Sequence, residues 1–156
     1  MEIVGQLQKQ FVDFTTSLYR EGILDGQFVE LQKLQDESTP DFVCELVSEY
    51  FQDSEKILTN LTTALQQQVV NFKVVDDHVH QFKGSSSSMG ALRVRNMCIA
   101  FKSLCEEKNL DGCLRCLQQL KHEFYLVKNK WETLFRLERQ ILEAGGAVPF
   151  VDYRFY

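Results

Sequence analysis

Three histidines are the residues of this 156-residue chain best suited to nucleophilic chemistry: His78, His80 and His122. A neutral imidazole has a lone pair on one ring nitrogen, and an ordinary pKa of about 6.5 keeps most of it neutral near pH 7. His80 follows Val79, which belongs to an apolar stripe at helical spacing, so it is turned by about 100° from that stripe. We therefore expect His80 to be exposed on a helix, His78 to lie at the boundary of the same helix, and no obvious partner for His122.

The residues that follow His80 suit a phosphoryl group bound to its ring. Lys83, at i+3, can reach such a group, and an ammonium is a fitting point charge beside phosphate. At i+4, where a side chain would lean back over the imidazole, stands Gly84. Glycine inside a helix costs about 1 kcal/mol relative to alanine, which suggests that the position needs clearance. An exposed helical histidine is usually an ordinary surface residue, and it is the combination with Gly84 and the following serines that distinguishes His80.

The five cysteines offer a second candidate chemistry, which the sequence does not favour. Cys113 and Cys116 form a C-x-x-C pair, but no strand precedes it, as one would in a thioredoxin-like site. A zinc site would need two more ligands, and only His122 is available. Cys98 and Cys105 lie seven residues apart on an apolar face and are interpreted as core. An odd number of cysteines without a secretory signal predicts free thiols in a reducing compartment. We expect neither a metal nor another cofactor.

Composition excludes several other classes of protein. Hydrophobic residues make up 44% and charged residues 25%, as in ordinary globular domains. The net charge of −5 disfavours nucleic acid or an anionic membrane as a partner. No apolar run reaches roughly 18 residues, so we expect no membrane insertion. The only two prolines are Pro40 and Pro149, and this lack of turn punctuation favours long helices.

Apolar periodicity predicts an all-α fold with six helices. The expected spans are residues 4–18, 28–34, 40–69, 73–92, 97–109 and 111–143. The last four form an antiparallel four-helix bundle, and the two N-terminal helices pack on one end of it. We expect one domain over residues 1–146, with its bundle core at about 40–144, and a short C-terminal tail over 147–156.

Local signals refine two of these helices. The third should start with a hydroxyl N-cap at Ser38 or Thr39 and with Pro40 at the first helical position. Asp76 and Asp77 are expected in the first turn of the fourth, as dipole and cap residues rather than as groups that tune His80. The serine-rich residues 84–90 could be a linker by composition. The seven-residue step from Phe82 to Met89 keeps the helical phase, however, so we expect the helix to continue.

The segment from His80 to Ala91, HQFKGSSSSMGA, closely resembles the HQxKGSSSSxGA signature of plant histidine-containing phosphotransfer (HPt) proteins. Residues 96–98, 105–107, 112–117 and 123–128 are also similar to that family, so the resemblance covers nearly the whole chain. It implies a phosphorelay intermediate of a two-component, cytokinin-type pathway, working as a monomer in the cytoplasm and nucleus. Such a protein accepts a phosphoryl group from the receiver-domain aspartate of a hybrid sensor histidine kinase and passes it to response-regulator receiver domains.

The resemblance assigns roles to residues of the motif. It implies that His80 is phosphorylated, that Lys83 is the cation beside the phosphate, and that Gly84 gives the receiver room. Phe82 stands where the family often has leucine, but it points inward and should not change activity. The protein would be a carrier rather than an enzyme, because the receiver supplies the metal and the acidic pocket, and no ATP-binding motif is present. The remaining motif positions are Gln81 and Ser85.

One alternative function and one interface remain open at this stage. Some plant relatives lack the histidine and act as adaptors or decoys that bind receivers without phosphotransfer, whereas this chain has kept His80. We expect the receiver to dock on a surface centred on His80 and flanked by Phe28 and Leu31 of the second helix. A hairpin about Asn71 would bring the facing part of the third helix, near residue 62, level with His80.

Overall fold

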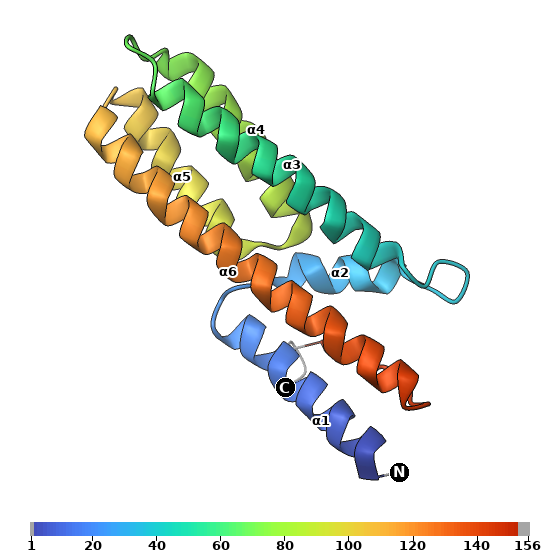
Figure 1. Cartoon of the computed structure of the whole chain (residues 1–156). Coiled ribbons are helices and arrows are strands. Elements are labelled where there is room, and N and C mark those ends of the chain that lie inside the picture. Colours follow the sequence, from blue (N-terminus) through green and yellow to red (C-terminus); the bar gives the residue numbers. More distant parts are fainter. Residues whose placement is uncertain (1, 153–156) are drawn as a thin grey trace.

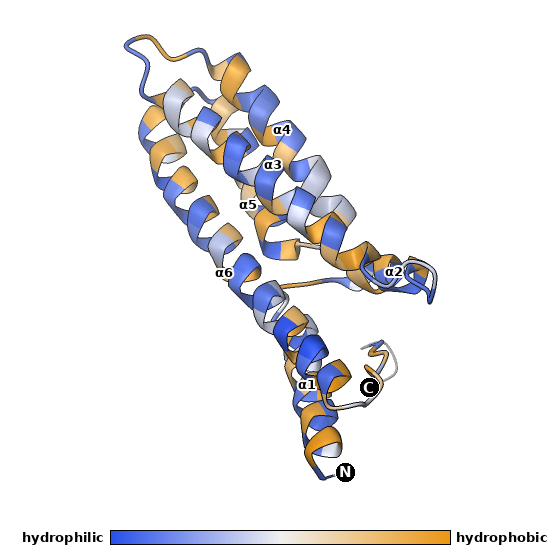
Figure 2. Cartoon of the chain, turned by 45° about the vertical axis from the view of Figure 1, so that its right-hand side comes forward, coloured by the Kyte–Doolittle hydropathy of each residue, from blue (hydrophilic) through white to orange (hydrophobic). Residues whose placement is uncertain are grey.

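The computed structural model describes residues 2–152, which form six α-helices and no strand apart from an isolated bridge between Leu24 and Ala91. Helices α3 to α6 lie side by side as an antiparallel bundle, which confirms the predicted fold class (Figure 1). None of the described helices is long and apolar enough to cross a membrane. Apolar and polar residues instead alternate around each helix (Figure 2). The helices are α1 (Glu2–Arg20), α2 (Gly26–Leu34), α3 (Phe42–Leu65), α4 (Phe72–Met89), α5 (Leu92–Glu106) and α6 (Leu110–Glu143).

An aromatic cluster fills the middle of the bundle. The ring of Tyr50 on α3 lies 6.3 Å from Phe82 on α4, and 6.0 Å and 5.8 Å from Phe124 and Trp131 on α6, centroid to centroid. Tilted and edge-on contacts at these distances are the favoured arrangements of aromatic pairs. Phe28 of α2 extends the cluster, 5.6 Å from Trp131. These contacts fix the orientation of α4 about its own axis, and with it the direction in which His80 points.

Helix α3 is shorter than predicted at both ends. The hydroxyls of Ser38 and Thr39 bind the Asp36 carboxylate at 2.6 and 3.1 Å, so neither is free to cap a helix, and α3 begins at Phe42. It ends at Leu65 rather than near residue 69. Val69, at the end of the predicted span, is 86% exposed in the connection to α4.

Helix α4 has a defined cap at each end. Asn71 accepts hydrogen bonds from the backbone N–H of Lys73 and Val74, at 3.1 and 3.3 Å. The helix continues through the serine run, as predicted, and stops at Gly90, whose φ of 78° is left-handed. This stop assigns Leu92 to α5 rather than to α4. The cap lies directly against α2, because a Cβ at Gly90 would be 2.7 Å from the backbone nitrogen of Phe28.

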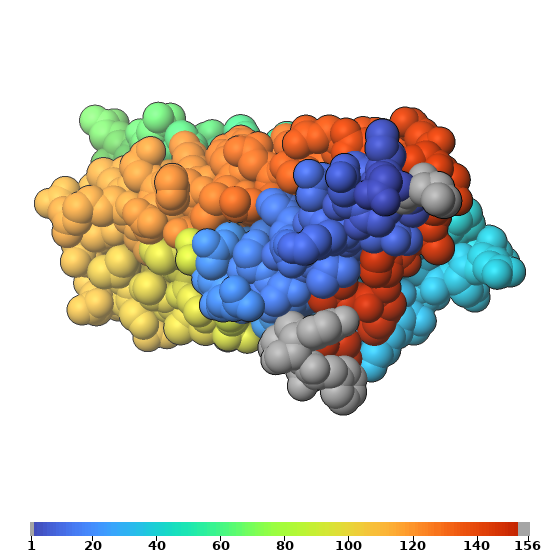
Figure 3. Space-filling model, turned by 90° about the horizontal axis from the view of Figure 1, so that it is seen from below, coloured from blue at the N-terminus to red at the C-terminus, as the bar shows by residue number. Residues whose placement is uncertain are grey.

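The two N-terminal helices pack at one end of the bundle, as expected. Helix α1 runs along the C-terminal half of α6, and Figure 3 shows the two in contact from below. Gln8 of α1 also donates a hydrogen bond to the Ala147 carbonyl at 2.8 Å. Val151 and Asp152 are buried, while residues 153–156 of the expected tail lie outside the described part. The predicted domain boundary at residue 146 stays a prediction.

Candidate functional site

His80 lies on the exposed face of α4, as the sequence predicts. The opposite face of the helix is buried in the bundle and consists of Val75, Val79, Phe82, Ser86 and Met89. Within residues 2–152 no hydrogen bond or ion pair involves the His80 ring, so both ring nitrogens are open to solvent or to a partner. His78 is half-buried and His122 is exposed on α6, so the expected boundary position of His78 is also confirmed.

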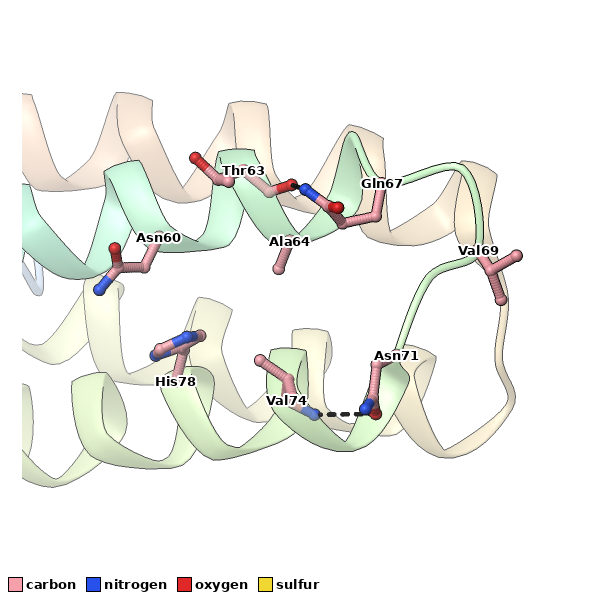
Figure 4. Close-up of a pocket in the computed structure, with 8 residues that line it drawn as sticks. All are labelled: Asn60, Thr63, Ala64, Gln67, Val69, Asn71, Val74 and His78. Carbon is pink, nitrogen blue, oxygen red and sulfur yellow. Dashed lines mark hydrogen bonds between the residues drawn. The ribbon is translucent and has the colours of Figure 1, made fainter.

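The two histidines of α4 point to different neighbouring helices. His78 faces α3 and lines a groove, with a volume of about 450 Å³, together with Asn60 and Ala64 (Figure 4). Asp76, one turn before His80, instead binds Lys102 of α5. Because residues four apart share one side of a helix, His80 lies toward α5. The groove is therefore separate from the His80 site, and the sequence pattern did not predict it.

Gly84 is not required by the packing of this chain. A Cβ built at Gly84 would have no atom of the described residues within 4 Å outside its own helix, and the residue is exposed. The space above it is open, next to His80, where a partner would approach. A glycine that costs helix stability without serving the fold points to a requirement outside the fold.

The remaining motif residues are placed as follows. Lys83 is half-buried and forms no ion pair with the described residues, so its ammonium is available to an anion. Burial raises the pKa of the Cys98 thiol on α5, and the charge of Lys83 opposes that increase. Gln81 is exposed beside His80. Ser85 is turned away from the site, since its hydroxyl donates to the Phe82 carbonyl at 3.2 Å.

Asp76 and Asp77 do not have the roles expected from the sequence. Helix α4 starts at Phe72, and its first turn contains no acidic residue. Both aspartates lie in the second turn and form ion pairs: Asp76 with Lys102 of α5, and Asp77 with Lys73 at 3.1 Å. The prediction failed because the partner of Asp76 is 26 residues away in the chain, beyond the reach of local pattern.

The expected receiver-docking surface also needs correction. Phe28 is 0% exposed and lies under the end of α4, so it cannot be an anchor, whereas Leu31 is partly exposed. The register of α3 differs too. Tyr50 meets Ser86, and Asn60 lies across from His78, so His80 is level with residues 56–58 rather than 62 (Figure 4). The shift follows from α3 ending early.

The cysteines are free thiols, and four of them are buried between α5 and α6. Burial raises the pKa of Cys98 to about 12 and that of Cys116 to about 11, which keeps both in the unreactive thiol form. Cys98 and Cys105 are core residues, as predicted. Within residues 2–152 no three potential metal ligands come together.

Known proteins share the sequence and fold of this chain. A model of the Hpt domain family matches residues 45–130. Histidine-containing phosphotransfer protein 1 of Arabidopsis thaliana is 59% identical, over 99% of this chain and 100% of that protein. Pseudo histidine-containing phosphotransfer protein 6 of the same plant is 45% identical over 94% and 96%. The crystal structure of MtHPt2 from Medicago truncatula superposes with a TM-score of 0.86 and 50% identity, covering 90% of this chain and 96% of that one.

Proposed function

Because the chain belongs to the Hpt family and is a phosphorelay intermediate, we propose that His80 is the residue that carries the phosphoryl group. The observation that carries this assignment is the environment of His80 on α4. The ring is exposed, Lys83 has no ionic partner among the described residues, and Gly84 leaves open space where a receiver would approach. His78, partly covered by α3, lacks these features.

The proposed transfer needs only a lone pair from this chain. The unprotonated ring nitrogen of neutral His80 attacks the phosphorus of the receiver's aspartyl phosphate. A nitrogen–phosphorus bond forms, the bond from phosphorus to the aspartate oxygen breaks, and the aspartate leaves as a carboxylate. The proton on the other ring nitrogen stays in place. Transfer onward to a second receiver is the same step in reverse, with that receiver's aspartate as the nucleophile.

We assign the protein the role of a carrier whose partners supply the remaining machinery. No described side chain is hydrogen-bonded to the His80 ring to act as its base. Lys83 supplies a positive charge, which offsets part of the charge of close to −2 that a phosphoryl group brings. The partners are the receiver domains of hybrid sensor histidine kinases and of response regulators. We propose that the chain works as a monomer in a cytokinin-type pathway, in the cytoplasm and nucleus.

Incubation with a radiolabelled phosphorylated receiver domain tests this function. We expect label on this chain that is lost in acid and stable in base, as a phosphorus–nitrogen bond requires. Fragment analysis by mass spectrometry should place the phosphate on the peptide that contains His80. A chain that binds the receiver and takes no label would be an adaptor or decoy instead.

A further inference from the structure

Two ion pairs lie on the N-terminal side of His80 along α4, and they differ in how exposed they are to solvent. Lys102 of α5 places its Nζ 3.2 and 3.1 Å from the two carboxylate oxygens of Asp76. The two side chains are only 34% and 26% exposed. Lys73 and Asp77 form the second pair within α4 itself, with side chains 81% and 62% exposed. The half-buried pair is less screened by solvent, so its charges act more strongly on a neighbour.

The direction of helical side chains brings the Asp76–Lys102 pair close to the reacting group. Side chains of a helix lean toward its N-terminus, so the His80 ring extends back over the turn that holds Asp76 and Asp77. Residues four apart have Cβ atoms about 5–6 Å from each other. A phosphoryl group on His80 would therefore lie within reach of the ammonium that Asp76 now holds.

The phosphoryl group is a stronger partner for Lys102 than the carboxylate is. It carries close to two negative charges and three acceptor oxygens, against one charge and two oxygens on Asp76. Phosphorylation also places the negative phosphoryl group near the negative carboxylate of Asp76. Their repulsion weakens the ion pair between Asp76 and Lys102. The ammonium can shift from one anion to the other by rotating its flexible stem, without movement of either helix.

We propose that Lys102 is a second phosphoryl-positioning residue, contributed by α5, which Asp76 holds in place until His80 is phosphorylated. This inference rests on the proposed function of His80. Lys83 is available at all times, whereas Lys102 engages only in the phosphorylated state. The carboxylate of Asp76 thus competes with the phosphoryl group for Lys102 and weakens the retention of phosphate on His80.

The test is the equilibrium of the phosphoryl group between one receiver domain and this chain, measured by phosphate-affinity electrophoresis. Lys102→Met keeps the length of the side chain and removes its charge, so it should shift the equilibrium toward the receiver by roughly tenfold. Asp76→Asn frees Lys102 and should shift it the opposite way, toward this chain. Lys102→Arg keeps the charge and should stay close to the parent. The exposed pair supplies the matched controls, Lys73→Met and Asp77→Asn, which should both move the equilibrium by less than about twofold.

A phosphorus NMR titration of the phosphorylated protein provides a readout that a purely structural role would not change. A cation beside the phosphoryl group favours its doubly charged form, so Lys102→Met should raise the pKa of that group, and Lys102→Arg should not. The proposal is overturned if Lys102→Met leaves both the equilibrium and this titration unchanged. It is also overturned if Asp76→Asn and Lys102→Met shift the equilibrium in the same direction. Failure of the parent chain to take phosphate on His80 would instead refute the proposed function.

Discussion

The two faces of α4 differ in whether contacts within the chain hold their side chains in place. The buried face holds Phe82 in the aromatic cluster and Ser86 in a 2.7 Å hydrogen bond to Tyr50, so each side chain is fixed by contacts within the chain. On the exposed face, His80 forms no hydrogen bond or ion pair with the described residues, and a Cβ at Gly84 would meet none of their atoms within 4 Å apart from the backbone of α4 itself. The residues that the fold does not need are the ones that we propose a partner uses. Substitutions on the two faces should therefore separate phosphotransfer from stability.

The largest expected effect is on the exposed face, from His80→Gln. This variant should accept no phosphate from a receiver, because it lacks the nucleophilic nitrogen. Its free energy of unfolding should change by no more than about 0.5 kcal/mol, since the side chain is exposed. Urea denaturation and receiver labelling measure the two quantities. His78→Gln is the control and should keep its activity; loss of labelling in that variant instead would move the site to the α3 side.

Gly84→Gln should slow transfer strongly while the protein remains folded. The longer side chain leans back over the His80 ring and stands where the receiver must approach. Gly84→Ala should slow it only slightly, and both variants should gain helix stability, by up to about 1 kcal/mol for alanine. Transfer rates at matched concentration and circular dichroism provide the comparison. A glutamine variant as fast as the parent would show that clearance is not the role of Gly84.

Gly90→Ala is the matched glycine substitution at the buried end of the same helix. In contrast to the Gly84 variants, it should lower stability and leave the transfer rate unchanged. A Cβ there would lie 2.7 Å from the Phe28 nitrogen, on a backbone with φ of 78°. We expect a loss of about 2 kcal/mol or more in unfolding free energy. The transfer rate per folded molecule should stay near the parent value below the unfolding transition. An unchanged stability would show that the contact between α2 and the end of α4 does not restrict this position.

Of the two variants on the buried side of α4, Ser86→Ala should have the smaller effect on stability. This change removes one partner of a buried hydrogen bond and leaves the Tyr50 hydroxyl without it, at a cost of about 1–2 kcal/mol. Transfer should be unaffected, because the side chain faces away from His80. Tyr50→Phe combined with Ser86→Ala should recover part of the loss, since neither polar group then remains unpaired. A double variant as unstable as the sum of the single ones would contradict this account.

Local sequence pattern was sufficient for most of the fold and for the exposure of His80. The apolar stripe from Val75 to Met89 predicted that α4 continues through the serines, because a helix positions side chains by spacing alone. The local pattern did not predict the register between α3 and α4. It depended on where α3 ends, and the predicted span ran on to residue 69 although Val69 is largely exposed in the connection to α4.

The environment of the site required tertiary information that spacing does not carry. Lys102 comes from another helix, so no local pattern links it to Asp76 or to His80. Phe28 appeared suitable as an anchor by its type alone, yet it is buried beneath the end of α4. The groove that holds His78 likewise forms only when α3 and α4 come together (Figure 4).

The closed ends of α4 have a consequence for the speed of signalling. Asn71 caps the first turn, and Gly90 packs the last turn against α2, so both ends of the helix that presents His80 are held by contacts. A surface that is already ordered loses little conformational entropy when a partner arrives. Specific recognition can then be achieved with modest affinity, and modest affinity permits rapid dissociation. A shuttle between successive partners needs this combination, because each complex must last long enough for one transfer and no longer.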